Sequence, residues 1–166
     1  MINIAHEPVQ PHRLLLCTDL DRTLIPNGPQ PESTHARERF SRLVAHSQVT
    51  LAYVSGRNRQ LVEQAIVQYA LPRPDYVIAD VGSSIYRLST GDWEYEHNWE
   101  QQISADWLGK TAHQLHPLFA DISSIRLQEA HKQNRHKLSY YVALTSDHRS
   151  IMSEMGERLK QPSIQA

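Results

Sequence analysis

Apolar residues in the first half of the chain form three short runs, with helix-like spacing between them. The runs lie at Arg13 to Thr18, Val49 to Val54 and Asp75 to Asp80, and the first is continuous enough to be a strand buried on both faces. Between the runs, apolar residues recur every three or four positions near 34–46 and 61–69, which predicts two amphipathic helices. This alternation of strands and helices with short connections is typical of a parallel α/β sheet.

The pattern changes after Asp80. Aromatic and β-branched residues on either side of Thr90-Gly91 predict a β-hairpin at the start of a second unit. Further elements are expected in the order helix, strand, strand, helix, at about residues 101–118, 123–128, 138–144 and 148–159. The sequence therefore predicts a leader at 1–12, an α/β core at 13–81 and a separate α+β module at 82–166.

Length, charge and cysteine content limit the classes of protein to which this chain can belong. The 166 residues are enough for one core, and 17 basic against 18 acidic side chains leave a net charge of −1. This balance argues against a general nucleic-acid or anionic-membrane binder. The single cysteine, Cys17, can form no internal disulfide, and no apolar run approaches the length needed to span a bilayer. We therefore expect a soluble cytoplasmic protein.

Two aspartates end the first predicted strand, in the stretch "CTDLDRTLI". Ligands of open parallel sheets bind beyond the carboxyl ends of the strands, where Asp19 and Asp21 meet Ser55-Gly56 from the second strand. Two carboxylates at this spacing can hold Mg²⁺, a hard cation that prefers oxygen ligands. We therefore predict that both aspartates bind Mg²⁺, with Ser55, Gly56 and Thr23 at the phosphoryl group.

The aspartate pair suits phosphoryl transfer. Asp19 can attack phosphorus to form an aspartyl-phosphate, and Asp21 can give a proton to the leaving alkoxide and later deprotonate water. The Ser55 hydroxyl and nearby backbone N–H groups would stabilise charge on the phosphoryl oxygens. Arg57 is expected to be a surface charge or a supporting residue, not a direct ligand.

Four segments resemble a known family. "DLDRTL" and "YVSGR" resemble the first two motifs of the haloacid dehalogenase (HAD) superfamily, and "PDYVIADVGSSIY" and "QNRHKLSYYV" resemble segments of its sucrose-phosphate phosphatase branch. The resemblance implies a Rossmann-like HAD core with an α+β cap, Mg²⁺ as cofactor and a sugar phosphate as substrate. It also makes Lys137 a substrate-facing cap lysine. Gly82 and Ser83 are expected to form the turn into the cap, with substrate contact as a second role.

The resemblance also has a gap. The family carries a lysine and an acidic G-D-x-x-N-D loop after the cap, and nothing between Thr145 and Ala166 resembles either. We expect a core of three strands with an open edge, which favours self-association or a partner chain that supplies the remaining core. Two alternatives to an active phosphatase are a non-catalytic module that binds sugar phosphates and a phosphomutase that uses the same aspartates.

Overall fold

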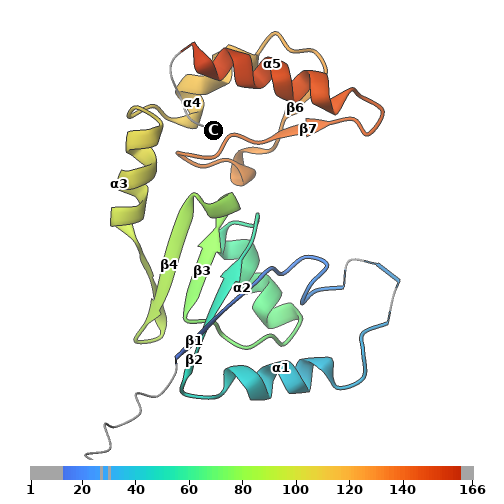
Figure 1. Cartoon of the computed structure of the whole chain (residues 1–166), viewed down its shortest axis with the longest axis vertical. Helices are drawn as coiled ribbons and strands as arrows, with labels where there is room; N and C mark the ends of the chain where they lie inside the picture. Colours follow the sequence, from blue (N-terminus) through green and yellow to red (C-terminus); the bar gives the residue numbers. More distant parts are fainter. Residues whose placement is uncertain (1–12, 27, 30, 162–166) are drawn as a thin grey trace, which may run out of the picture.

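A five-stranded sheet lies at the centre of the lower lobe in Figure 1. The computed structural model describes residues 13–26, 28–29 and 31–161, so the leader expected at 1–12 lies outside the described residues. The sheet order is β1-β2-β3-β4-β5, with β1, β2 and β3 parallel and β4 and β5 antiparallel. The strand bounds are β1 Leu14–Thr18, β2 Val49–Val54, β3 Tyr76–Ala79, β4 Ser84–Ser89 and β5 Asp92–Tyr95. The prediction of an α/β fold with a parallel sheet is confirmed.

Two helices cover one face of this sheet. Helix α1 (Ala36–Val44) links β1 to β2, and helix α2 (Arg59–Gln68) links β2 to β3. Alternate residues of the strands pack against them, among them Leu51, Tyr53 and Val77, which are at most 2 % exposed. Asn58 caps α2, because its side-chain oxygen accepts from Leu61 N at 2.9 Å. This packing fixes the loops at the carboxyl ends of β1, β2 and β3.

The hairpin of β4 and β5 continues the core sheet. It turns at Thr90-Gly91 as expected, and Gly91 has φ +97°, a value that glycine adopts without strain. However, β4 pairs along its length with β3, from Tyr76 opposite Arg87 to Ala79 opposite Ser84. A boundary at residue 82 therefore divides hydrogen-bonded strands. The tight 3₁₀ turn η1 (Asp80–Gly82) folds the chain straight back onto β3.

The upper lobe holds the remaining elements (Figure 1). Strands β6 (Ile125–Leu127) and β7 (Tyr140–Val142) form a two-stranded antiparallel sheet. The helical elements are α3 His97–Asp106, α4 Ala112–Leu115, η2 His116–Phe119, η3 Ala130–Lys132 and α5 His148–Lys160. In the described residues, no helix is long and apolar enough to cross a membrane.

The single helix expected at 101–118 is in fact two elements. Helix α3 starts earlier and ends at Asp106, after which Leu108 (φ +51°) and Gly109 (φ +72°) turn the chain. Helix α4 then begins with a capping box, in which Thr111 and Gln114 satisfy each other's backbone N–H groups. The helix prediction was wrong over residues 107–111 because apolar spacing continues across this break.

Candidate functional site

Three acidic or hydroxyl side chains lie one residue beyond the ends of three neighbouring parallel strands. Asp19 follows β1, Ser55 follows β2 and Asp80 follows β3. The register pairs Thr18 with Tyr53 and Val54 with Ile78, so these ends meet at one edge of the sheet. Asp19 and Ser55 therefore occupy the crevice region predicted for them.

A buried leucine turns the loop after β1. Leu20 is fully buried, and its carbonyl accepts from Thr23 N, Leu24 N and Ile25 N at 2.8–3.3 Å. This turn leaves Asp19 exposed at the sheet edge, where its Oδ1 accepts from Leu20 N at 2.7 Å. The carboxylate of Asp19 is thus oriented by the backbone and remains accessible to a ligand.

Arg57 joins the two halves of the predicted site. Its Nε donates to Asp21 Oδ2 at 2.9 Å and its Nη2 to Asp21 Oδ1 at 2.7 Å, a bidentate ion pair. The hydrogen bonds that Arg57 donates to Asp21 raise the pKa of Arg57 above its usual value. The backbone N of Arg57 also donates to Ser55 Oγ at 3.2 Å. Asp21 is therefore held beside Ser55 through Arg57, although the two residues are 34 positions apart in sequence.

Ser55 is buried and Gly56 is exposed at the start of the turn into α2. The backbone N of Ser55 donates to Ile78 O, and its carbonyl accepts from Val81 N, which ties the end of β2 to the end of β3. A Cβ on Gly56 would lie 3.8 Å from Val81 Cγ2, in ordinary contact, so this glycine is not required by crowding. Ser55 therefore has a fixed backbone and a hydroxyl that faces the start of α2.

Lys137 connects the cap to the core. Its Nζ donates to Gly56 O at 3.0 Å and lies 3.3 Å from Asp80 Oδ1. The side chains of Lys137 and Asp80 are only 10 % and 7 % exposed, so this ion pair is largely removed from water. Asp80 and Val81 both adopt left-handed backbone angles, φ +55° and +60°, which are rare for a β-branched residue. The strand end that carries Asp80 is thus held in an uncommon conformation beneath the cap lysine.

A cavity of about 200 Å³ lies between the two lobes at this edge. Its core-side lining is Asp21, Gly56, Arg57, Asn58 and Leu61, and its cap-side lining is Gln128, His131, Lys132 and Lys137. Three of these side chains are cationic, and each is paired with a carboxylate: Arg57 with Asp21, Lys137 with Asp80 and Lys132 with Glu129. Asn58 Nδ2 donates to His131 O at 2.9 Å and closes one side.

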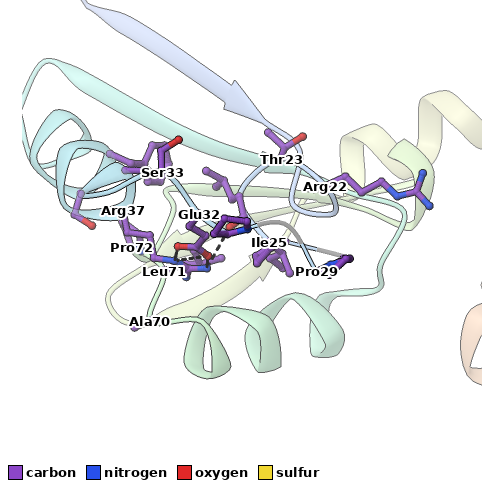
Figure 2. Close-up of a pocket in the computed structure, with 17 residues that line it drawn as sticks. Arg22, Thr23, Ile25, Pro29, Glu32, Ser33, Arg37, Ala70, Leu71 and Pro72 are labelled. Atoms are coloured by element: carbon purple, nitrogen blue, oxygen red, sulfur yellow. Dashed lines mark hydrogen bonds and ion pairs between the residues drawn. The ribbon is translucent and has the colours of Figure 1, made fainter.

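Of the predicted residues, Asp21, Gly56 and Lys137 line this cavity, whereas Asp19 and Ser55 lie at the same sheet edge outside its lining. Thr23 lines a larger cavity of about 580 Å³ between the loop after β1, helix α1 and the turn after α2 (Figure 2). There Arg37 forms an ion pair with Glu32 and also donates to the backbone carbonyls of Tyr69 and Leu24. That cavity contains none of the site's aspartates, and we assign no function to it.

Gly82 and Ser83 act in the turn that leads into β4. The Gly82 carbonyl accepts from Trp99 Nε1 at 2.8 Å. The Ser83 hydroxyl donates to Asp80 O at 2.9 Å and accepts from Asn134 Nδ2 at 2.9 Å. The turn that was predicted for them is observed; neither residue lines the cavity, and substrate contact by these residues stays a prediction.

The sequence predicted Arg57 to be a surface charge or a supporting residue, and did not single out Asp80 or Lys132. Arg57 is only 27 % exposed in its side chain and binds Asp21 directly. Its position directly after Ser55-Gly56 was a usable signal, because the turn that follows a parallel strand lies at the ligand-binding edge of the sheet. Lys132 gave no such signal, since its place in the cavity depends on how the cap folds back.

Asp19 and Asp21 supply only part of a ligand set for Mg²⁺. Asp19 offers carboxylate oxygens, whereas both oxygens of Asp21 already accept from Arg57. In the described ranges, no group of three or more His, Cys, Asp or Glu side chains is placed to hold a metal ion. Asp19 is therefore the best-placed metal ligand here, and water or further ligands would have to complete the shell.

Comparison with known proteins identifies the family. The family model for sucrose-6F-phosphate phosphohydrolase matches residues 12–166, which is nearly the whole chain. The chain belongs to the sucrose-6F-phosphate phosphohydrolase family. The resemblance to the HAD superfamily and its sucrose-phosphate phosphatase branch is thereby confirmed.

The similar proteins are longer than this chain. A protein of Nitrosococcus oceani, described as a HAD-like hydrolase, is 47% identical over 154 residues, 93% of this chain and 42% of the relative. Sucrose-phosphatase 2 of Arabidopsis thaliana is 26% identical over 89% of this chain and 34% of its own length. The chain thus spans less than half the length of these curated relatives.

A solved structure shares the fold of this family member. The sucrose-phosphatase of Synechocystis, solved with sucrose and phosphate, superposes with a TM-score of 0.73 at 22% identity. The match covers 92% of this chain and 58% of that chain. At this identity the superposition establishes the fold alone.

Proposed function

We propose that this chain carries the nucleophile and the acid/base of a Mg²⁺-dependent phosphatase that hydrolyses a sugar phosphate. The observation that supports this most is the pairing of Asp21 with Arg57 beside Ser55, at the strand edge that also presents Asp19. The relatives named for sucrose-phosphate hydrolysis suggest the same substrate class.

The first half-reaction follows from the placement of Asp19. A carboxylate oxygen of Asp19 attacks phosphorus, the bond from phosphorus to the ester oxygen breaks, and the sugar oxygen takes a proton from the Asp21 carboxyl group. A bound Mg²⁺ would offset the repulsion between the phosphate and the aspartates. The Ser55 hydroxyl would hold a phosphoryl oxygen as charge shifts.

The second half-reaction restores the carboxylate of Asp19 and the protonated carboxyl group of Asp21. Asp21 removes a proton from water, the resulting hydroxide attacks phosphorus, and the bond from phosphorus to Asp19 breaks. Inorganic phosphate leaves, and Asp19 is again a free carboxylate. Asp21 is then protonated for the next ester, so the protons balance over one turnover.

In this scheme, Arg57 controls when Asp21 can act as the acid. While its guanidinium forms two hydrogen bonds with Asp21, it favours the ionised carboxylate, which cannot donate a proton. A phosphate presents the same bidentate geometry with more charge, and can therefore draw Arg57 away from Asp21. In our proposal, substrate binding thus releases Asp21 from Arg57, and Asp21 takes up a proton from the solvent before it acts as the acid in the first turnover.

The direct test is phosphate release from a panel of sugar phosphates with Mg²⁺. We expect turnover by the wild type and a loss of at least about 10³-fold in Asp19→Asn, because the amide cannot attack phosphorus. Asp92→Asn is the matched control, since Asp92 is an exposed aspartate in the β4–β5 hairpin, far from the site. Equal turnover by Asp19→Asn and the wild type would contradict the proposal.

A second candidate is a non-catalytic sugar-phosphate-binding module. The incomplete metal ligand set among the described residues favours it. In that case sugar phosphates would raise the melting temperature of the wild type without releasing phosphate. Thermal shift and phosphate release, measured on one sample, separate the two functions.

A further inference from the structure

The turn η1, which follows β3, has a backbone conformation that is rare for its residues. Asp80, Val81 and Gly82 have φ values of +55°, +60° and +90°, all in the left-handed region. Glycine adopts such values without strain, but a β-branched valine rarely does. A strained segment of this kind persists only where the surrounding contacts hold it, and such segments are concentrated at functional sites. The contacts of η1 therefore show which part of the molecule its conformation serves.

On one side, η1 holds the loop between β2 and α2 that carries Ser55. Val81 N donates to Ser55 O at 3.2 Å. Asp80 N donates to Arg57 O at 2.9 Å. Two carbonyls of this loop, one on each side of Gly56, are thus bonded to the backbone of η1.

These bonds orient the amide groups of the same loop. The carbonyl and the N–H of one trans peptide unit point in opposite directions, and the described residues contain no cis peptide bond. The N–H groups of Gly56 and Asn58 therefore point away from η1. Between them, Arg57 N donates to Ser55 Oγ at 3.2 Å, while the carbonyl of its own peptide unit, Gly56 O, accepts from Lys137 Nζ. The N–H groups of the loop thus lie on the side of the Ser55 hydroxyl, where successive N–H groups can bind the oxygens of an anion.

On its other side, η1 is held from the upper lobe by Asn134. The Nδ2 of Asn134 donates to Ser83 Oγ at 2.9 Å and to Ser84 Oγ at 3.3 Å. The Ser83 hydroxyl in turn donates to Asp80 O at 2.9 Å, within η1. Both serines are at most 8 % exposed, so water cannot readily replace the amide of Asn134.

Asn134 is itself fixed in a short turn of the upper lobe. It forms an antiparallel bridge with Lys137, in which Asn134 N donates to Lys137 O at 3.2 Å. The Oδ1 of Asn134 accepts from His136 N at 2.8 Å. The carbonyl oxygen of this side chain is therefore bonded within the upper lobe, and its nitrogen is bonded to the serines of the lower lobe.

We propose that Asn134 is a positioning residue for the phosphoryl group. Through Ser83 and η1, it holds the loop of Ser55 in the conformation that directs the loop's N–H groups to the phosphoryl oxygens. This inference rests on the proposed phosphatase function, because it assigns a role at the phosphoryl group. Asn134 is not among the residues that line the cavity between the lobes, so it acts through the backbone of the lower lobe and not by contact with the substrate.

Amide hydrogen exchange of the full chain, measured by NMR, tests whether Asn134 holds η1. Asn134→Ala removes both hydrogen-bonding groups of the side chain. Asn134→Asp removes only the donor and keeps the oxygen that accepts from His136 N, so the turn in the upper lobe is retained. In both variants we expect the amides of Asp80 and Val81 to exchange at least about tenfold faster, because η1 is no longer held against the loop. The amides of β2 should keep their exchange rates.

Phosphate binding tests whether this hold matters for the site. Inorganic phosphate is titrated with Mg²⁺ into each protein, and the amide signals of Gly56 and Asn58 are followed. We expect saturable shifts in the wild type and an affinity at least about fivefold weaker in both Asn134 variants. A residue that only stabilised the fold would leave the affinity of the folded protein unchanged. Asn98→Ala is the matched control, because Asn98 is an exposed asparagine of α3, and it should change neither readout.

Three results would overturn the proposal. The first is unchanged exchange of the Asp80 and Val81 amides in the Asn134 variants, and the second is equally faster exchange throughout the chain. The third is phosphate affinity in these variants equal to that of the wild type. A wild type whose Gly56 amide does not respond to phosphate would contradict the proposed function, and with it a role at the phosphoryl group. The exchange rates would report the hold on η1 in that case too, so the two failures are distinguishable.

Discussion

Replacing Lys137 with methionine should destabilise the protein strongly. The substitution keeps most of the apolar stem and removes the ammonium group that lies 3.3 Å from Asp80 Oδ1 and 3.0 Å from Gly56 O. The Asp80 side chain is 7 % exposed, so water can replace the lost partner only in part. Breaking a buried ion pair in this way costs about 3–5 kcal/mol. For a chain of this size, that loss corresponds to a fall in melting temperature of roughly 10 °C.

The assay is urea unfolding followed by circular dichroism and by tryptophan fluorescence, which must give coincident transitions for a single free energy. Lys160→Met is the matched control, since Lys160 is 72 % exposed and pairs with Glu157 at the surface of α5. An exposed pair contributes only about 0–1 kcal/mol, so the control should lie close to the wild type.

The double variant Lys137→Met/Asp80→Asn gives the decisive comparison. An asparagine in place of Asp80 would tolerate the left-handed backbone at this position and would remove the uncompensated charge. We therefore expect the double variant to be more stable than the sum of the single variants predicts, by at least about 1 kcal/mol. Strictly additive effects, or a cost for Lys137→Met as small as that for Lys160→Met, would refute the reasoning that this pair joins the two lobes.

Three further predictions concern the site, the pH dependence and two glycines. Arg57→Lys keeps the charge but loses the bidentate geometry, so kcat/KM for sugar phosphates should fall by about tenfold or more. An unchanged kcat/KM would contradict a role for Arg57 at the phosphate. Burial holds the pKa of His136 below its usual value, so the stabilisation that comes from its neutral imidazole should be fully present above about pH 7. The free energy of unfolding should decrease as the pH falls through about 6.5, the usual pKa of histidine. Urea titrations at each pH should show that His136→Phe removes this decrease. Gly109→Ala should destabilise the protein by about 1–2 kcal/mol, because Gly109 has a φ of +72°. Gly156→Ala should stabilise it by about 0.5–1 kcal/mol, because Gly156 lies within helix α5. Thermal melts in which Gly156→Ala is the less stable variant would contradict this expectation.

The positions of Asp19 and Ser55 could be predicted from the sequence because they depend only on the order of the parallel strands. Asp19 and Ser55 each follow an apolar run, and the carboxyl ends of parallel strands meet at one edge whatever the details of packing. The same pattern located all three parallel strands to within one residue of their bounds. Positions that follow from strand order alone could therefore be predicted.

Contacts between segments that are distant in the sequence could not be predicted from the spacing of apolar and polar residues. Lys137 meets Asp80 across 57 positions and Gly56 across 81, and no periodicity encodes such a pairing. The β4–β5 hairpin was predicted as a hairpin, but alternation does not say which sheet a hairpin joins. The helix break before Thr111 did have a local signal, in the glycine at 109 and the capping box that follows it.

Detection of the phosphoryl group on Asp19 tests the central claim most directly. The full chain would be mixed with Mg²⁺ and a sugar phosphate, quenched in acid at early times, digested and analysed by mass spectrometry, with hydroxylamine treatment to identify an acyl phosphate. The account predicts a hydroxylamine-sensitive phosphoryl group on the peptide that contains Asp19, and none in Asp19→Asn. Release of phosphate with the label on another residue, or with full labelling in Asp19→Asn, would contradict it.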